Sequence, residues 1–72
     1  MTFDELPLVQ IDYTKPGPRA DAPAGYVLAT SATLRGLRVA FNSGKRKGHA
    51  GACILHQIDR HGARFFLFGV KP

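Results

Sequence analysis

The sequence predicts a small, mainly β domain with at most a minor helical part, built as a twisted antiparallel sheet of about four strands. Two observations carry this prediction. In the C-terminal half, apolar runs rich in β-forming residues are separated by polar, glycine-containing segments. Near the N-terminus lies another apolar run with imperfect alternation. We therefore expect an N-terminal strand added to a C-terminal three-stranded meander.

The 72 residues are expected to form one domain, because so short a chain has room for only one hydrophobic core. Residues 1–13 should hold the N-terminal strand, residues 14–25 a proline- and glycine-rich linker, and residues 26–72 the basic β-meander. Pro7 should confine the first strand to a sheet edge or mark its start, since proline donates no backbone hydrogen bond. The linker has no helical pattern, so an extended, polyproline-like path is expected.

Three apolar runs define the predicted meander: Leu34 to Phe41, Ala52 to Ile58, and Ala63 to Val70. As a strand, the first run would place Arg35 and Arg38 on opposite faces. The last run is apolar on both sides, which is typical of a strand in the centre of a sheet. Before the meander, Gly25 to Thr33 begins apolar and ends in small and hydroxyl residues, and both a short strand and a single helical turn fit it.

The two connections within the predicted meander differ in kind. Asp59 to Gly62 is a short hairpin connection in which Gly62 can supply the positive φ that such turns need. Asn42 to Gly51 is longer, with three glycines and three consecutive cations, Lys45, Arg46 and Lys47. These cations beside glycine N–H groups suit phosphate oxygens. A solvated hairpin tip also needs charge, so both interpretations of the loop stay open.

The charge balance favours an anionic partner. Ten basic and five acidic residues give a formal net charge of +5, and eight of the bases follow Thr33. This positive charge would attract RNA, the ribosome or an acidic protein surface. If the partner is a nucleic acid, the residues expected to bind it are Arg35, Lys45, Arg46, Lys47, Arg60 and Arg64.

Other classes of protein fit the sequence poorly. The single cysteine, Cys53, excludes an intramolecular disulfide, and the scattered histidines show no zinc-ligand spacing, so no metal and no cofactor are expected. No apolar run approaches the roughly 18 residues of a membrane span, and the N-terminus lacks a signal-peptide pattern, so we expect a cytoplasmic protein. The aromatic run Phe65 to Phe68 places large side chains on both faces of one strand, which predicts a concentration-dependent homodimer.

Several segments resemble the C-terminal half of the RelE/HigB-like toxins of bacterial toxin-antitoxin systems. These segments are GYVLATSATLRGLRV from Gly25 to Val39, the glycine- and lysine-rich loop, GACILHQID and FFLFGVKP. The most specific element is L-R-G-L-R with its upstream glycine. The resemblance implies a ribosome-dependent mRNA endonuclease that works through basic residues, with an antitoxin as protein partner. It implies that Arg38 and Lys71 stabilise the phosphate charge while His56, or alternatively His61, accepts a proton from the 2′-hydroxyl.

The chain departs from the family pattern in two respects. The family has two helices between its first strand and the meander, and residues 14–25 are too short and too helix-poor to supply them. Cys53 stands where the family has an arginine, so catalysis is expected to be reduced or absent. The alternative is a phage-type small inhibitor that binds a host machine, such as RNA polymerase or a defence complex, through its sheet surface or exposed edge. A binder of this kind needs a surface and no cleft.

Overall fold

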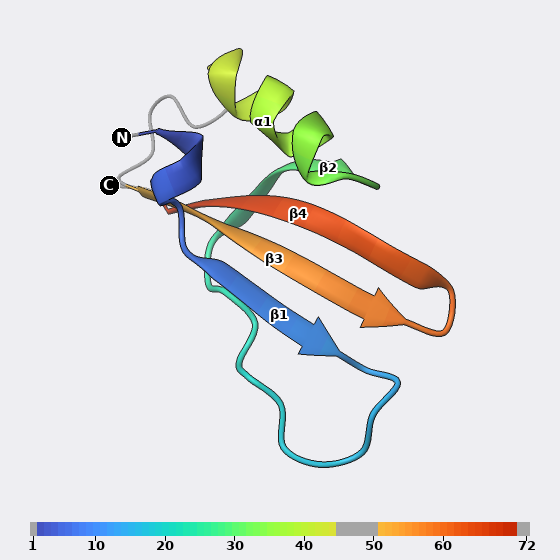
Figure 1. The fold of residues 1–72 in the computed structure, drawn as a ribbon. Coiled ribbons are helices and arrows are strands. Elements are labelled where there is room, and N and C mark those ends of the chain that lie inside the picture. The colour runs from blue at the N-terminus through green and yellow to red at the C-terminus, as the bar shows by residue number, and fades with distance from the viewer. Residues whose placement is uncertain (1, 45–50, 71–72) are drawn as a thin grey trace.

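A computed structural model describes residues 2–44 and 51–70 of the chain. Its elements are η1 (Phe3–Glu5), β1 (Leu8–Asp12), β2 (Tyr26–Ser31), α1 (Leu34–Asn42), β3 (Gly51–Asp59) and β4 (Gly62–Val70). The strands form one sheet in the order β1-β3-β4-β2, in which β1 runs parallel to β3 and the other neighbours are antiparallel (Figure 1). The predicted mainly β domain with about four strands is therefore confirmed, with one parallel pair in its sheet.

The run from Leu34 to Phe41 is a helix, so its prediction as a strand is wrong. Thr33 caps the helix, because its side-chain hydroxyl accepts a hydrogen bond of 3.1 Å from the backbone N–H of Gly36. Helical spacing then puts Leu37 and Phe41 on one face, where they are 0% and 7% exposed. The third antiparallel strand is instead β2, which pairs with β4. It comes from Gly25 to Thr33, the segment that fitted either a short strand or a helical turn.

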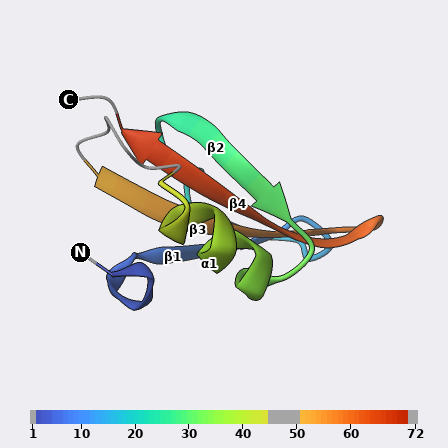
Figure 2. The same ribbon diagram turned by 90° about the horizontal axis from the view of Figure 1, so that it is seen from above.

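The sheet separates two unlike layers (Figure 2). On one side α1 packs against β4 and β2 and contacts η1. The linker 14–25, which contains no helix or strand, passes along the other side from β1 to β2 at the opposite edge (Figures 1 and 2). Residues 14–25 supply no helix, as expected, and α1 covers part of one sheet face from a later place in the chain.

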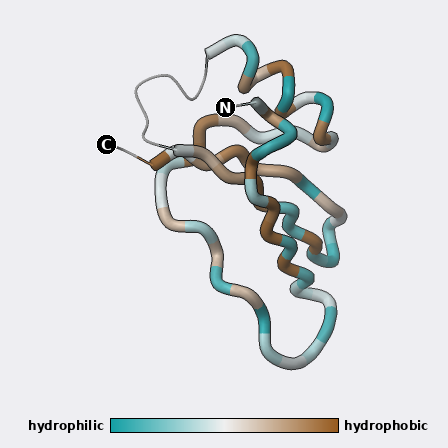
Figure 3. The backbone as a smooth tube through the Cα atoms, turned by 60° about the vertical axis from the view of Figure 1, so that its left-hand side comes forward, coloured by the Kyte–Doolittle hydropathy of each residue, from teal (hydrophilic) through white to brown (hydrophobic). Residues whose placement is uncertain are grey.

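The hydrophobic core lies between the sheet and its helical layer. Its buried residues come from η1 and the turn after it, from α1 and from the two central strands: Phe3, Leu6, Leu37, Phe41, Ile54 and Leu67. The Phe3 and Phe41 rings meet edge to face with centroids 5.8 Å apart. Figure 3 shows the same distribution, with hydrophobic segments gathered in the sheet and a paler, more hydrophilic linker. This packing fixes α1 and η1 beside each other.

Three local predictions are confirmed. Gly62 has φ +122° at the hairpin between β3 and β4, where Asp59 and Gly62 flank the two turn residues. The doubly apolar strand β4 lies in the sheet interior, between β3 and β2. Pro7 directly precedes β1 at a sheet edge, and its carbonyl accepts a hydrogen bond of 2.8 Å from the N–H of Ile54. No helix among the described residues is long and apolar enough to cross a membrane.

Candidate nucleic-acid interface

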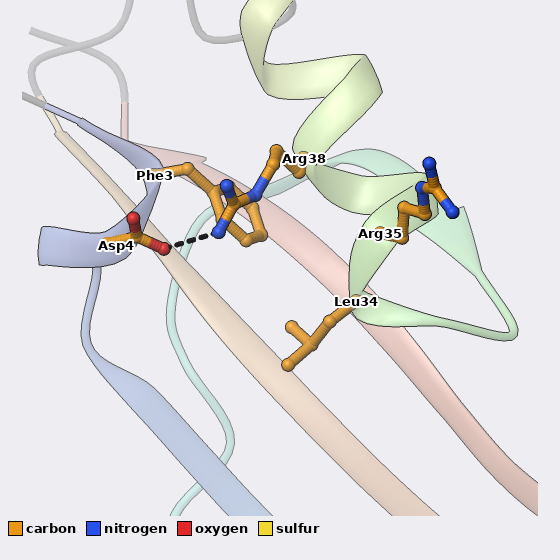
Figure 4. Close-up of a pocket in the computed structure, with 5 residues that line it drawn as sticks. All are labelled: Phe3, Asp4, Leu34, Arg35 and Arg38. Carbon is orange, nitrogen blue, oxygen red and sulfur yellow. Dashed lines mark hydrogen bonds and ion pairs between the residues drawn. The ribbon is translucent and has the colours of Figure 1, made fainter.

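The side of α1 next to η1 carries two arginines. Arg35 and Arg38 line a shallow depression between the two helical elements, together with Phe3, Asp4 and Leu34 (Figure 4). The strand prediction had placed these arginines on opposite faces, and the structure corrects this. Residues three apart are neighbours on a helix surface, so both arginines line the same depression.

Arg38 is held in place by two contacts with η1. Its Nη2 donates to Asp4 Oδ1 at 2.6 Å, and its Cζ lies 5.5 Å from the centroid of the Phe3 ring. The side chains of Arg38 and Asp4 remain 52% and 74% exposed. Exposed ion pairs of this kind contribute only about 0–1 kcal/mol, so an incoming anion can compete with Asp4 for the guanidinium.

Arg35 is the unengaged member of the pair. It is exposed and makes no hydrogen bond or ion pair with any residue in the described ranges. Figure 4 shows its guanidinium pointing away from Asp4, on the far side of the depression from Arg38. Its charge is therefore available to a partner in solution at little desolvation cost.

His56 lies on the same side of the sheet as α1 and is half-buried. Ile54, two residues earlier on β3, belongs to the core beneath the helical layer, and alternate residues of a strand share one face. The imidazole stacks on the ring of Phe65, its directly paired neighbour on β4, with centroids 4.3 Å apart and an interplanar angle of 6°. Of the expected catalytic residues, Arg38 and His56 thus share one side of the sheet, and Lys71 lies outside the described residues.

The remaining basic candidates are distributed over other surfaces. Arg64 lies on the face opposite α1, where its Nε donates to Thr30 Oγ1. Arg60 is exposed in the turn between β3 and β4. The cations Lys45, Arg46 and Lys47 lie outside the described residues. The structure therefore brings together Arg35 and Arg38 and separates them from Arg60 and Arg64.

Sequence reasoning missed the part of the site contributed by η1. A capping box is visible in the sequence as Thr2 followed three residues later by Glu5, and in the structure Thr2 N and Oγ1 both donate to Glu5 Oε1. That pattern could have identified a helical start at residue 3. No local signal predicts that Asp4 pairs with Arg38, because the two are 34 positions apart.

Two other polar groups have shifted pKa values. Hydrogen bonds from the Thr14 side chain and backbone lower the pKa of Asp12 below its ordinary value of 3.8. Burial raises the pKa of the Cys53 thiol above 9.0. Cys53 lies on the face opposite α1, because its neighbours in the strand, Ala52 and Ile54, face the helical layer. No group of three or more His, Cys, Asp or Glu side chains within residues 2–44 and 51–70 could hold a metal ion.

No protein-family model, no curated protein and no solved structure matches the chain.

Proposed function

We propose that the protein is a small RNA-binding module, directed to RNA or to the ribosome, and that its α1 arginines grip the phosphate backbone. The observation that carries this proposal is the exposed Arg35, which has no partner among the described residues and lies one helical turn from Arg38. A helix surface that presents two arginines at this spacing can contact neighbouring phosphates. The net charge of +5 supports association with a polyanion.

We further propose that the module is a catalytically reduced relative of the RelE/HigB-like toxins. The ring of His56 is stacked on Phe65 and the guanidinium of Arg38 is paired with Asp4, so each group already has a structural contact. Cys53, which replaces the family arginine, lies on the opposite face of the sheet from both. These arrangements favour binding over general acid–base chemistry, which requires groups that converge on one reacting atom.

The test measures RNA affinity against salt concentration for the double variant Arg35→Ala/Arg38→Ala. Each lost phosphate contact should lower the slope of log affinity against log salt by about 0.7 for single-stranded RNA, so the double variant should lose about 0.7 for Arg35 and up to about 0.7 more for Arg38, whose charge Asp4 partly neutralises. Fluorescence anisotropy with a labelled oligonucleotide gives both affinity and slope. The triple variant Lys45→Ala/Arg46→Ala/Lys47→Ala tests, in the same assay, the loop that the sequence predicts to grip phosphates.

Arg60→Ala/Arg64→Ala is the matched control, because it removes the same charge from the turn and from the opposite face. It should change the slope much less than the α1 pair does. Equal effects of the two double variants would mean that only the net charge matters. Unchanged affinity and slope in the α1 variant would overturn the proposal.

One observation favours the alternative, a phage-type inhibitor of a host machine. β2 is an edge strand, and its Tyr26 and Val27 side chains are 53% and 54% exposed. An exposed edge can accept an added strand from a protein partner. Capture of a protein partner from a lysate that survives RNase treatment, and that a Val27→Lys substitution abolishes, would support this alternative.

A further inference from the structure

Part of the sheet face that carries α1 is uncovered. The helix packs against β4 and β2 and contacts η1, so it leaves the ends of β1 and β3 near the β3–β4 hairpin open (Figure 2). One row of paired residues begins in this open region on β1 and crosses the sheet to β2, where its last member lies close to Gly36 of α1: Gln10, His56, Phe65 and Ser31. Because paired residues share a face, all four side chains stand on the α1 side.

The two rings in this row form an asymmetric stack. Phe65 packs against the core cluster, whereas His56 lies on the outer side, toward β1. One face of the imidazole is covered by Phe65 at 4.3 Å. The other face turns toward Gln10, whose side chain is exposed on the edge strand. His56 is therefore the open end of a stack whose inner end is anchored in the core.

The β2 end of the same row reaches the helix that carries the arginines. Ser31, at the β2 end of the row, accepts a hydrogen bond of 3.2 Å from the N–H of Thr33, the residue that caps α1. Arg35 belongs to the first turn of that helix. Leu34, which is 40% exposed, points from the same turn toward the strands and lines the depression beside Arg38 (Figure 4). The arginines of α1 and the His56–Phe65 stack thus lie on the same side of the sheet.

We propose that an unpaired nucleobase stacks on the outer face of His56 and extends the two-ring stack to three. The Gln10 amide, next in the row, would offer a donor and an acceptor to the edge of that base. This proposal rests on the proposed function, because it is the α1 arginines that hold the neighbouring phosphates. The ligand class is single-stranded RNA, since a duplex keeps its bases stacked inside and displays only backbone and groove edges.

Stacking and phosphate contacts have different experimental signatures. A base stacked on an aromatic side chain raises affinity by a factor of roughly 5 to 150 that hardly depends on salt, whereas phosphate contacts set the salt slope. Three ligands of equal length separate the two terms: a single-stranded oligoribonucleotide, an abasic ribose-phosphate oligomer and an RNA duplex. A 2-aminopurine base in the first ligand reports stacking directly, because its fluorescence is quenched when it stacks.

The decisive comparison uses His56→Leu, which keeps apolar bulk and loses the ring, and His56→Phe, which keeps a ring. We expect His56→Leu to bind the single strand about tenfold more weakly with an unchanged salt slope, and to lose 2-aminopurine quenching. Its affinity for the abasic oligomer should be unaltered, and His56→Phe should bind like the wild type. His61→Leu, in the exposed hairpin turn, is the matched control and should change nothing.

Wild-type protein that binds the abasic oligomer or the duplex as tightly as the single strand would overturn the stacking site, and this holds even if His56→Leu fails to fold. Single-strand binding by His56→Leu that is as tight as in the wild type would also overturn the stacking site. In either case a weakened Arg35→Ala/Arg38→Ala variant would leave the proposed function standing. Absence of binding to all three ligands by the wild type would overturn the stacking site together with the proposed function.

Discussion

Arg38 and Asp4 join α1 to η1 through an ion pair of 2.6 Å, although 34 positions separate them in the sequence. The pair occupies the guanidinium that a phosphate would need. Asp4 therefore has two effects on the site, since it orients Arg38 over the Phe3 ring and also neutralises part of its charge. The affinity of the protein for a polyanion such as RNA should show which of these two effects is larger.

Asp4→Asn should strengthen RNA binding. The substitution removes the negative charge that competes with phosphate while keeping a group of similar shape, so Arg38 becomes a full phosphate contact. We expect affinity to rise a few-fold at low salt and the salt slope to steepen by up to about 0.7. The free energy of unfolding should change by less than about 1 kcal/mol, because the pair is exposed. Anisotropy titrations and urea unfolding measure the two quantities.

Asp21→Asn is the control for this prediction, because it removes the same charge from the exposed linker. It should raise affinity less than Asp4→Asn does. Equal gains from the two variants would show that Asp4 acts only through net charge, and would contradict competition for Arg38.

Thr33→Ala should destabilise the helix that positions both arginines. The Thr33 hydroxyl accepts the Gly36 N–H at 3.1 Å, and no acidic residue in the first turn of α1 adds a second stabilising contact there. Loss of such an N-cap costs about 1 kcal/mol. Thr33→Ser keeps the hydroxyl and should retain most of the stability. Thermal unfolding followed by circular dichroism would separate the two variants, and an unchanged Thr33→Ala would mean that tertiary packing alone holds α1.

Much of the sheet could be predicted from the sequence, because two of its strands carry unambiguous patterns. The runs that became β3 and β4 are apolar and β-forming and are joined by a short turn with Gly62, so periodicity and turn chemistry agree. The strand prediction for Leu34 to Phe41 was wrong. It relied on the β-forming residues Val39 and Phe41 and on an alternation of apolar residues with a period of two. The spacing of Leu37 and Phe41, with Thr33 just before the run, was the helical signal.

The candidate site was less predictable than the fold. The sequence identifies Arg35 as a candidate through its charge, and Arg38 and His56 through the resemblance to the RelE/HigB-like toxins. Their arrangement depends on α1 packing beside η1 and on the register that pairs His56 with Phe65, and neither is a local property of the sequence. The parallel pairing of β1 with β3, which places Gln10 next to His56, is likewise a consequence of long-range topology.

Thr14→Val should raise the pKa of Asp12. The Thr14 hydroxyl is the largest cause of the lowered pKa and its backbone N–H, at 2.9 Å, is the next, so the shift should be removed only in part. With a lowered pKa in the folded state, the ionised carboxylate stabilises the protein above about pH 3.8, and this contribution is lost as the pH falls through the folded-state pKa. Carbon-detected NMR titration of the carboxyl group measures the change, and Thr30→Val should leave it unaffected.

The Cys53 thiol should react slowly while the protein is folded. Burial raises its pKa above 9.0, so near pH 9 less thiolate is present in the folded chain than in the unfolded one. The neutral thiol therefore favours the folded state below about pH 9, and this contribution is lost as the pH rises through the folded-state pKa. Iodoacetamide should alkylate Cys53 faster in denaturant than in buffer. Cys53→Ala should show a smaller fall in stability than the wild type between pH 8 and pH 10.

Gly36→Ala should destabilise the protein even though alanine is the better helix former by about 1 kcal/mol. A Cβ at this position would lie 2.0 Å from Ser31 Oγ and 2.8 Å from Ser31 Cβ, so α1 or the end of β2 would have to shift, at a cost of about 1–3 kcal/mol. Ser31→Gly removes both clashing atoms. The double variant should therefore be more stable than the two single changes predict when added. Gly51→Ala, whose new Cβ would have no atom of residues 2–44 or 51–70 within 4 Å, should stay within about 0.5 kcal/mol of the wild type in urea unfolding. Simple additivity at positions 31 and 36 would show that the close approach of α1 to β2 does not limit the packing of the helix.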